Sequence, residues 1–70
     1  MSYEIEVSWD EEARVWCGIC DSIPLALESN SLDVLVMRVK IAVPEILSLN
    51  GEKSEGVKLC FKMAHWEQVA

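Results

Sequence analysis

Apolar and polar side chains alternate along four short stretches of the chain, and this period of two is typical of β-strands. The stretches cover residues 3–9, 14–20, 25–29 and 57–63. A polar, turn-forming segment joins the first two stretches, which predicts a β-hairpin. Before the third stretch the pattern breaks at Pro24, because proline fixes its own φ and biases the preceding residue away from helix.

The alternation assigns one row of each strand to the core. Within residues 14–20 we assign the row that starts at Val15 to the inner face, so that Trp16, Gly18 and Cys20 fall on the outer face. The inner positions of the other strands are Tyr3, Ile5, Val7, Trp9, Leu25, Leu27, Val57, Leu59, Phe61 and Met63.

Residues 31–50 carry the one long helix signal in the sequence. Ser31 suits the N-cap, Asp33 places a negative charge in the first turn, and Asn50 followed by Gly51 is a recognisable stop. At about 100° per residue, a broad apolar stripe runs along one side, which we expect to pack on a sheet. The stripe consists of Leu32, Leu35, Val36, Val39, Val43, Ile46 and Leu47.

The opposite side of this helix is also apolar, at Val34, Met37 and Ile41. A helix that is apolar on two sides needs two partners, so either the C-terminal tail around Trp66 covers these residues or another chain does. Inside the apolar period, Pro44 removes one backbone hydrogen bond and crowds the preceding turn. We therefore expect a kink or a restart of the helix there.

The element order βββαβ predicts a single α+β domain that spans the 70 residues, with an ordered core over about residues 3–63. If the first three strands form a meander and the helix returns the last strand beside and parallel to the first, the sheet order is 3-2-1-4. The helix then packs on one face. Outward Glu4 and Glu6 would neighbour outward Lys58 and Lys62, and each opposite-charge pair favours this arrangement by about 0.2–1 kcal/mol.

The net charge and the length of the chain limit the classes of molecule that it is expected to bind. Six Lys plus Arg stand against twelve Asp plus Glu, for a formal net charge of -6, which repels nucleic acid and favours a basic protein. A core of this size is only marginally self-sufficient, which favours a homodimer. The N-terminus lacks signal-peptide features, no apolar run approaches a membrane span, and three cysteines is an odd number. These features predict a cytoplasmic protein.

The cysteines and the one histidine raise the question of a metal site. Cys17 and Cys20 form a CxxC motif, to which Cys60 and His65 add two further ligand types. Residues three apart on a strand point to opposite faces, whereas zinc needs converging ligands. We therefore expect no metal: Cys17 is a small core residue, and Cys20 and Cys60 lie on the outer face. No nucleophile stands at a readable spacing from His65.

Five carboxylates lie on the first strand and the turn after it, at Glu4, Glu6, Asp10, Glu11 and Glu12. Two-metal nuclease chemistry would need carboxylates that converge from several elements, and the partner strand offers lysines instead. We expect a solvated, salt-bridged surface without catalytic residues or a cofactor. Trp16, outward by alternation, either belongs to an interface or covers neighbouring strands.

Three segments carry a resemblance to a known family. In residues 15–24, VWCGICDSIP, a strand leads into a turn with aspartate and proline; the segment 31–33, SLD, opens a helix; and residues 42–51, AVPEILSLNG, end it. With these features the chain resembles the HicB-like antitoxins, and most closely the short proteins of that group that consist of the N-terminal domain alone. The resemblance covers residues 3 to about 63 and implies a partly degenerate ribonuclease-H-like βββαβ domain.

HicB-like proteins are the antitoxins of type II toxin–antitoxin pairs. The resemblance implies a non-enzymatic protein-binding module that neutralises a small, basic, RNA-cleaving toxin of the HicA-like type. The usual C-terminal DNA-binding segment of these antitoxins is not found in the sequence, so we expect no direct contact with nucleic acid. The alternative is an orphan domain that self-associates without a toxin. Candidate contact residues are Glu4, Glu6, Asp10, Glu11, Glu12, Trp16, Val34, Met37 and Ile41.

Overall fold

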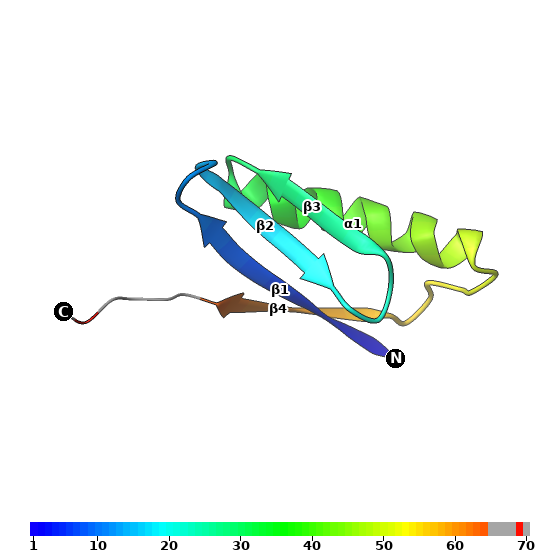
Figure 1. Ribbon diagram of the computed structural model, residues 1–70. Coiled ribbons are helices and arrows are strands. Elements are labelled where there is room, and N and C mark those ends of the chain that lie inside the picture. Colours follow the sequence, from blue (N-terminus) through cyan, green and yellow to red (C-terminus); the bar gives the residue numbers. More distant parts are fainter. Residues whose placement is uncertain (65–68, 70) are drawn as a thin grey trace.

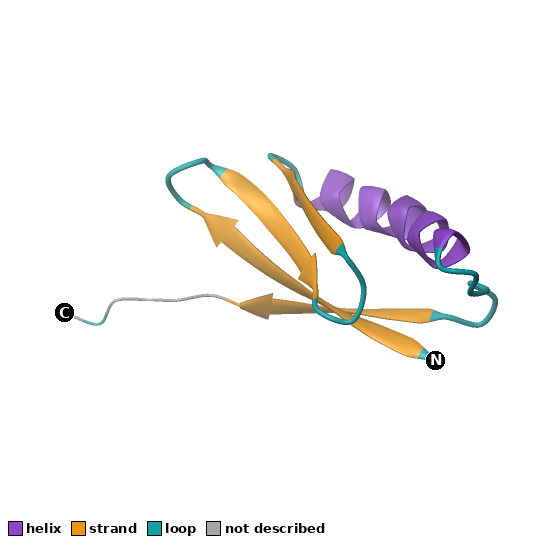
Figure 2. Cartoon of the chain, turned by 45° about the vertical axis from the view of Figure 1, so that its right-hand side comes forward, coloured by secondary structure: helices purple, strands orange, loops and turns teal. Residues whose placement is uncertain are grey.

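The computed structural model describes residues 1–64 and Val69. Its elements are β1 (Ser2–Asp10), β2 (Val15–Cys20), β3 (Leu25–Ser29), α1 (Leu32–Leu49) and β4 (Lys58–Ala64), as Figure 1 shows. The strands form one layer and the helix a second layer on one face of the sheet (Figure 2). The predicted α+β fold is confirmed.

The sheet order is β3-β2-β1-β4. β1 pairs with β2 and β2 with β3 in antiparallel fashion, whereas β4 lies parallel to β1. Parallel neighbours need a crossover connection, and α1 supplies it between β3 and β4. The predicted order 3-2-1-4 is therefore confirmed.

The hairpin turn between β1 and β2 is organised by Asp10. Its side-chain Oδ1 accepts hydrogen bonds from the backbone N–H groups of Glu12 and Ala13, at 3.0 and 3.1 Å. Its carbonyl accepts from the N–H of Arg14 at 2.7 Å, and Arg14 has a left-handed φ of 57°. A left-handed residue closes a turn rather than extending a strand, which is why β2 begins at Val15.

The helix begins and ends where its caps predict. Ser31 Oγ accepts a hydrogen bond from the N–H of Val34 at 3.4 Å, and the N–H of Asn50 donates to carbonyls of the last turn. Gly51 follows with a left-handed φ of 75°, as is common after a helix end. The helix continues through Pro44 to Leu49, so the restart that was one expected outcome does not occur.

The core lies between the helix and the inner face of the sheet. Four residues of the predicted apolar stripe are buried, and the other three are half-buried at its margins. β1 contributes Tyr3, Ile5 and Val7, as its alternation predicts. The remaining buried apolar residues are Cys20, Ile23, Leu25, Leu35, Val39, Val43 and Leu47.

The phase of β2 is the reverse of the one assigned from the sequence. Residues directly opposite each other in an antiparallel pair share a face, and Gly18 lies opposite the buried Val7. The inner row is therefore Trp16, Gly18 and Cys20, and Ile19 is outward and 45% exposed. Trp16 thus faces inward, where its ring centroid lies 5.2 Å from that of Trp9 at an interplanar angle of 59°.

The inner row of β4 is less covered than expected. Leu59 and Phe61 are half-buried, and Met63, expected inside, is 59% exposed. The helix packs against β2 and β3, and β4 lies at the opposite edge of the sheet, beyond β1. One helix is too narrow to cover four strands, so the apolar side of β4 remains partly open.

Candidate functional site: an acidic groove on the outer sheet face

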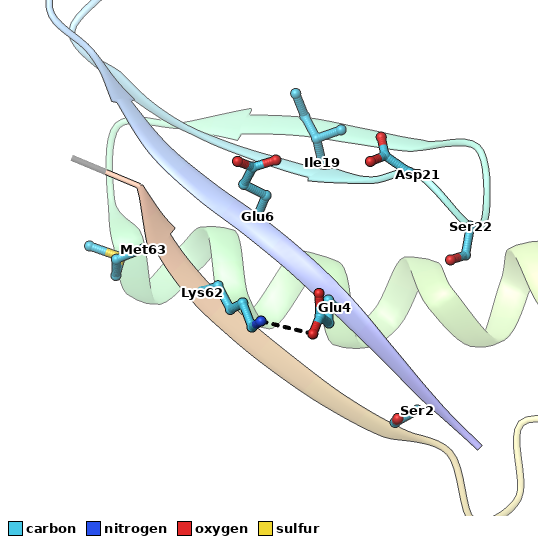
Figure 3. Close-up of a pocket in the computed structure, with 8 residues that line it drawn as sticks. All are labelled: Ser2, Glu4, Glu6, Ile19, Asp21, Ser22, Lys62 and Met63. Carbon is cyan, nitrogen blue, oxygen red and sulfur yellow. Dashed lines mark ion pairs between the residues drawn. The ribbon is translucent and has the colours of Figure 1, made fainter. Parts of the chain in front are cut away.

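An open groove of about 660 Å³ runs over the sheet face that points away from the helix. Figure 3 shows its side chains, which come from β1, the end of β2, the turn after it, and β4. The lining residues are Ser2, Glu4, Glu6, Ile19, Asp21, Ser22, Lys62 and Met63. Polar groups dominate, and three of them are carboxylates.

Alternation along β1 positions two of these carboxylates. Because Tyr3, Ile5 and Val7 enter the core, Glu4 and Glu6 between them must point outward. Antiparallel pairing then brings the end of β2 alongside the same part of β1. The turn that follows β2 carries Asp21 and Ser22 to the rim, and the outward Ile19 adds an apolar side chain to the floor.

Lys62 of β4 provides the positive charge of the groove. In the parallel register it lies beside Glu6, and its Nζ forms an ion pair with Glu4 Oε1 at 2.9 Å. This hydrogen bond from Lys62 to Glu4, together with the attraction of the carboxylate charge, raises the pKa of Lys62 above its usual value. The predicted neighbourhood of acidic β1 and basic β4 residues is confirmed, although Lys58 aligns with Ser2 rather than with a glutamate.

Glu6 and Asp21 give the groove its negative character. Within residues 1–64 neither side chain takes part in an ion pair, since the structure shows only the bridge to Glu4 and one between Arg14 and Glu11 at 3.7 Å. A site with two free carboxylates, two serine hydroxyls and two apolar side chains suits the docking of lysine or arginine side chains.

The other predicted carboxylates lie at the opposite end of β1, in the hairpin turn (Figure 1). Asp10 is engaged by backbone N–H groups of the turn, and Glu11 accepts a hydrogen bond from Trp9 Nε1 at 2.7 Å. Both therefore act within the domain. Glu12 is exposed. The five acidic candidates thus separate into a groove pair and a turn group.

The cysteines do not assemble a metal site in the described residues, among which no three His, Cys, Asp or Glu side chains are placed so that they could hold a metal ion. Cys17 and Cys20 lie on opposite faces, as expected of residues three apart, but Cys20 is the buried one and Cys17 lies on the outer face. Burial, and then the charges of Asp10 and Glu28, raise the pKa of Cys17, which disfavours the thiolate that metals bind. Cys60 is exposed as predicted, and His65 lies outside the described residues.

The second predicted surface, on the helix, is present as an exposed apolar row. Val34, Met37 and Ile41 are 44%, 59% and 62% exposed. Trp66, one of the two expected sources of cover, lies outside the described residues. Trp16, the remaining candidate, is half-buried on the inner face, so the outward placement expected for it is wrong.

Sequence reasoning missed Ile19, Asp21 and Ser22 as members of the groove. The sequence pattern places Ile19 on the inner face of β2, which is the wrong face. It identifies Asp21 and Ser22 only as part of the turn before Pro24. A usable signal was present in Gly18. A glycine within a strand often marks a close approach by a neighbouring element, which would have assigned its row to the helix side.

The comparison with known protein families identifies the family of the chain. Residues 2–68 match the family described as domain of unknown function DUF1902. The chain belongs to this family. DUF1902 thus spans nearly the whole sequence, in accordance with the predicted short, uncharacterised domain.

The fold of this chain also appears in a solved structure. The chain is similar to the crystal structure of hypothetical protein TTHA1013 from the extremely thermophilic bacterium Thermus thermophilus, with a TM-score of 0.83 and 31% sequence identity. The alignment covers 97% of this chain and 99% of that one. No curated protein matches the chain. In the described part of the chain, no helix has both the length and the apolar character that crossing a membrane requires.

Proposed function

We propose that this DUF1902 domain is a non-enzymatic protein-binding module of the antitoxin type, acting in the cytoplasm. In this proposal its acidic outer face binds and neutralises a small, basic, RNA-cleaving toxin of the HicA-like type. The carrying observation is the groove in which Glu6 and Asp21 lie beside the Glu4–Lys62 pair. The net charge of -6 acts in the same direction, because it steers a basic partner toward the domain.

The groove combines the two features of a protein-binding surface. Its carboxylates can accept charge-assisted hydrogen bonds from lysine or arginine. Ile19, 45% exposed among them, offers an apolar anchor that a partner would bury. The resemblance of residues 15–24 to the HicB-like strand and turn supports the same proposal, since that segment forms one wall of the groove.

The experiment is co-expression with a basic protein encoded by the neighbouring gene, followed by isolation of a complex at low ionic strength. We expect a complex whose dissociation constant rises with salt, because exposed charges are screened. If no complex forms at low ionic strength, the proposal fails.

Charge reversals locate the surface. Glu6→Lys and Asp21→Lys should each raise the dissociation constant about tenfold or more, as expected when a contact at the centre of an interface becomes repulsive. Glu52→Lys is the matched control, because Glu52 lies in the exposed loop after α1 and its substitution changes the net charge equally. If Glu52→Lys lost as much affinity as the groove variants, binding would depend on the net charge of the domain, which would contradict binding in the groove.

A further inference from the structure

The outer edge of β4 is the one open strand edge of substantial length in the described residues. β4 ends the sheet and has seven residues. The edge at the other end of the sheet belongs to the shorter β3, which has five residues, and there Arg38 Nη1 donates to the carbonyl of Glu28 at 2.8 Å. An unpaired strand edge presents N–H and C=O groups that can pair with another chain.

The groups that are free on β4 can be identified from the parallel ladder. The N–H of Lys58 donates to the carbonyl of Met1 at 3.1 Å, so Lys58 points its backbone groups toward β1. The side to which the backbone N–H and C=O groups point alternates from residue to residue along a strand. The backbone groups of Cys60 and Lys62 therefore point toward β1, as those of Lys58 do. The N–H and C=O groups of Leu59, Phe61 and Met63 therefore point to the open edge.

The same three residues carry the apolar side chains of β4. By register Leu59, Phe61 and Met63 lie beside Tyr3, Ile5 and Val7, and so share the face that the helix covers elsewhere. Leu59 and Phe61 are half-buried, and Met63 is 59% exposed. Along the outer edge of β4, backbone groups thus lack hydrogen-bond partners within the sheet, and apolar side chains remain partly exposed.

The distribution of charge on the molecule favours a second copy of the chain as the partner that pairs with the open edge of β4. The molecule is acidic overall, with a net charge of -6, so most approaches of two copies are repulsive. The outer face near β4 is balanced in charge, because it carries Lys58 and Lys62 as well as Glu4 and Glu6; Lys62 lies beside Glu6 and forms an ion pair with Glu4. Two copies can therefore meet along β4 without bringing their acidic regions together.

We propose that two copies of this chain pair β4 with β4 in antiparallel fashion about a two-fold axis at Phe61, which joins the two sheets into one. Phe61 then faces its own copy, and Leu59 faces Met63 of the second copy, each as a hydrogen-bonded pair. The apolar rows of both copies become continuous on the inner face. The two helices lie on the same side of the joined sheet, because an axis normal to a sheet exchanges edges without exchanging faces.

The lysines specify this register. With Phe61 on the axis, Lys62 stands opposite Cys60 of the second copy, and its charge remains paired with Glu4. A shift of the axis by one residue to Cys60 would place Lys58 opposite Lys62, and a shift to Lys62 would place that residue opposite itself. Like charges directly opposite are destabilising in a sheet, so both shifts are disfavoured. This inference does not rest on the proposed toxin, although Lys62 and Met63 of β4 also line the outer groove.

Sedimentation of two methionine variants tests the surface. We expect the wild-type chain to be a dimer, and Met63→Lys to raise the dimer dissociation constant about tenfold or more by placing a charge in the apolar row. Met37→Lys is the matched control, since Met37 on the helix is also 59% exposed. A monomeric wild-type chain, or a dimer that Met37→Lys disrupts and Met63→Lys does not, would overturn the proposal.

Cross-linking tests the register. Opposed residues of a non-hydrogen-bonded pair have Cα atoms about 4.5 Å apart, within the range of a disulfide. With oxidised glutathione, Lys62→Cys should therefore form a covalent dimer through the native Cys60, and the double variant K62C/C60S should not. If the wild-type chain cross-links through Cys60 and Lys62→Cys adds nothing, the axis lies at Cys60 and the register is wrong.

Discussion

Leu35 of the helix packs directly over Gly18 of β2. Its Cδ2 and Cδ1 atoms lie 3.5 and 3.6 Å from the position that a Cβ atom on Gly18 would occupy, and a methyl carbon of Ile5 lies 3.6 Å from it. A side chain larger than a single Cβ at Gly18 would meet Leu35 and push the helix away from the sheet. This contact determines which face of β2 is buried, and with it the composition of the outer groove.

Substitutions at Gly18 should distinguish two effects on stability: the conformational freedom of the unfolded backbone, and the space available between β2 and the helix. A single Cβ fits at ordinary contact distance, so Gly18→Ala should stabilise the domain by up to about 1 kcal/mol by reducing the freedom of the unfolded chain. Gly18→Val adds methyl groups that meet Leu35, and should destabilise by about 1–3 kcal/mol. Urea unfolding measures both. Stabilisation by Gly18→Val would mean that this row faces outward.

Trp16 should behave as a structural residue. It is half-buried and packs against Trp9, so Trp16→Ala should lower the free energy of unfolding by about 1–3 kcal/mol through lost apolar burial and lost ring contact. Tryptophan fluorescence during thermal unfolding reports the change. An unchanged stability combined with a weaker complex with a partner would place Trp16 in an interface instead.

The Lys62–Glu4 pair should contribute little to stability, and only while Lys62 is charged. Both side chains are more than half exposed, where ion pairs are weak and screened by salt. Because the pKa of Lys62 is raised in the folded state, its contribution is fully present at neutral pH. It is lost as the pH rises through the raised pKa. Lys62→Gln should therefore be slightly less stable than the wild type at pH 7 and equal to it at strongly alkaline pH, as measured by urea unfolding at each pH.

The three thiols should react at different rates with iodoacetamide. Cys60 is exposed and should react first, whereas the buried Cys20 should react only after unfolding. Cys17 should be slow at neutral pH, because it is half-buried and its raised pKa leaves little thiolate. Mass spectrometry of the labelled chain gives the order. Zinc that co-purifies at one ion per chain and protects Cys17 and Cys20 together would contradict this arrangement.

Local pattern was sufficient for most of the fold. The strands follow from alternation, and the helix follows from the Ser31 cap, the apolar stripe and the stop at Asn50. These signals depend on neighbouring residues, so the sequence contains them. The order of strands also followed, since a short meander and one crossover helix leave few arrangements. The acidic residues of β1 were correctly placed on the outer face for the same reason.

Only the tertiary structure decided which face of β2 is inside. In Val15–Cys20 both alternating rows contain apolar residues, and a period of two specifies alternation without specifying direction. The direction comes from the pairing of Gly18 with Val7 and from the fit of Leu35 above it, contacts between residues far apart in the chain. These contacts turn Trp16 toward the inner face and Ile19 toward the outer face, where Ile19 lines the groove together with Asp21. The exposed Met63 has a similar cause, because the width of one helix and its position over β2 and β3 are properties of packing.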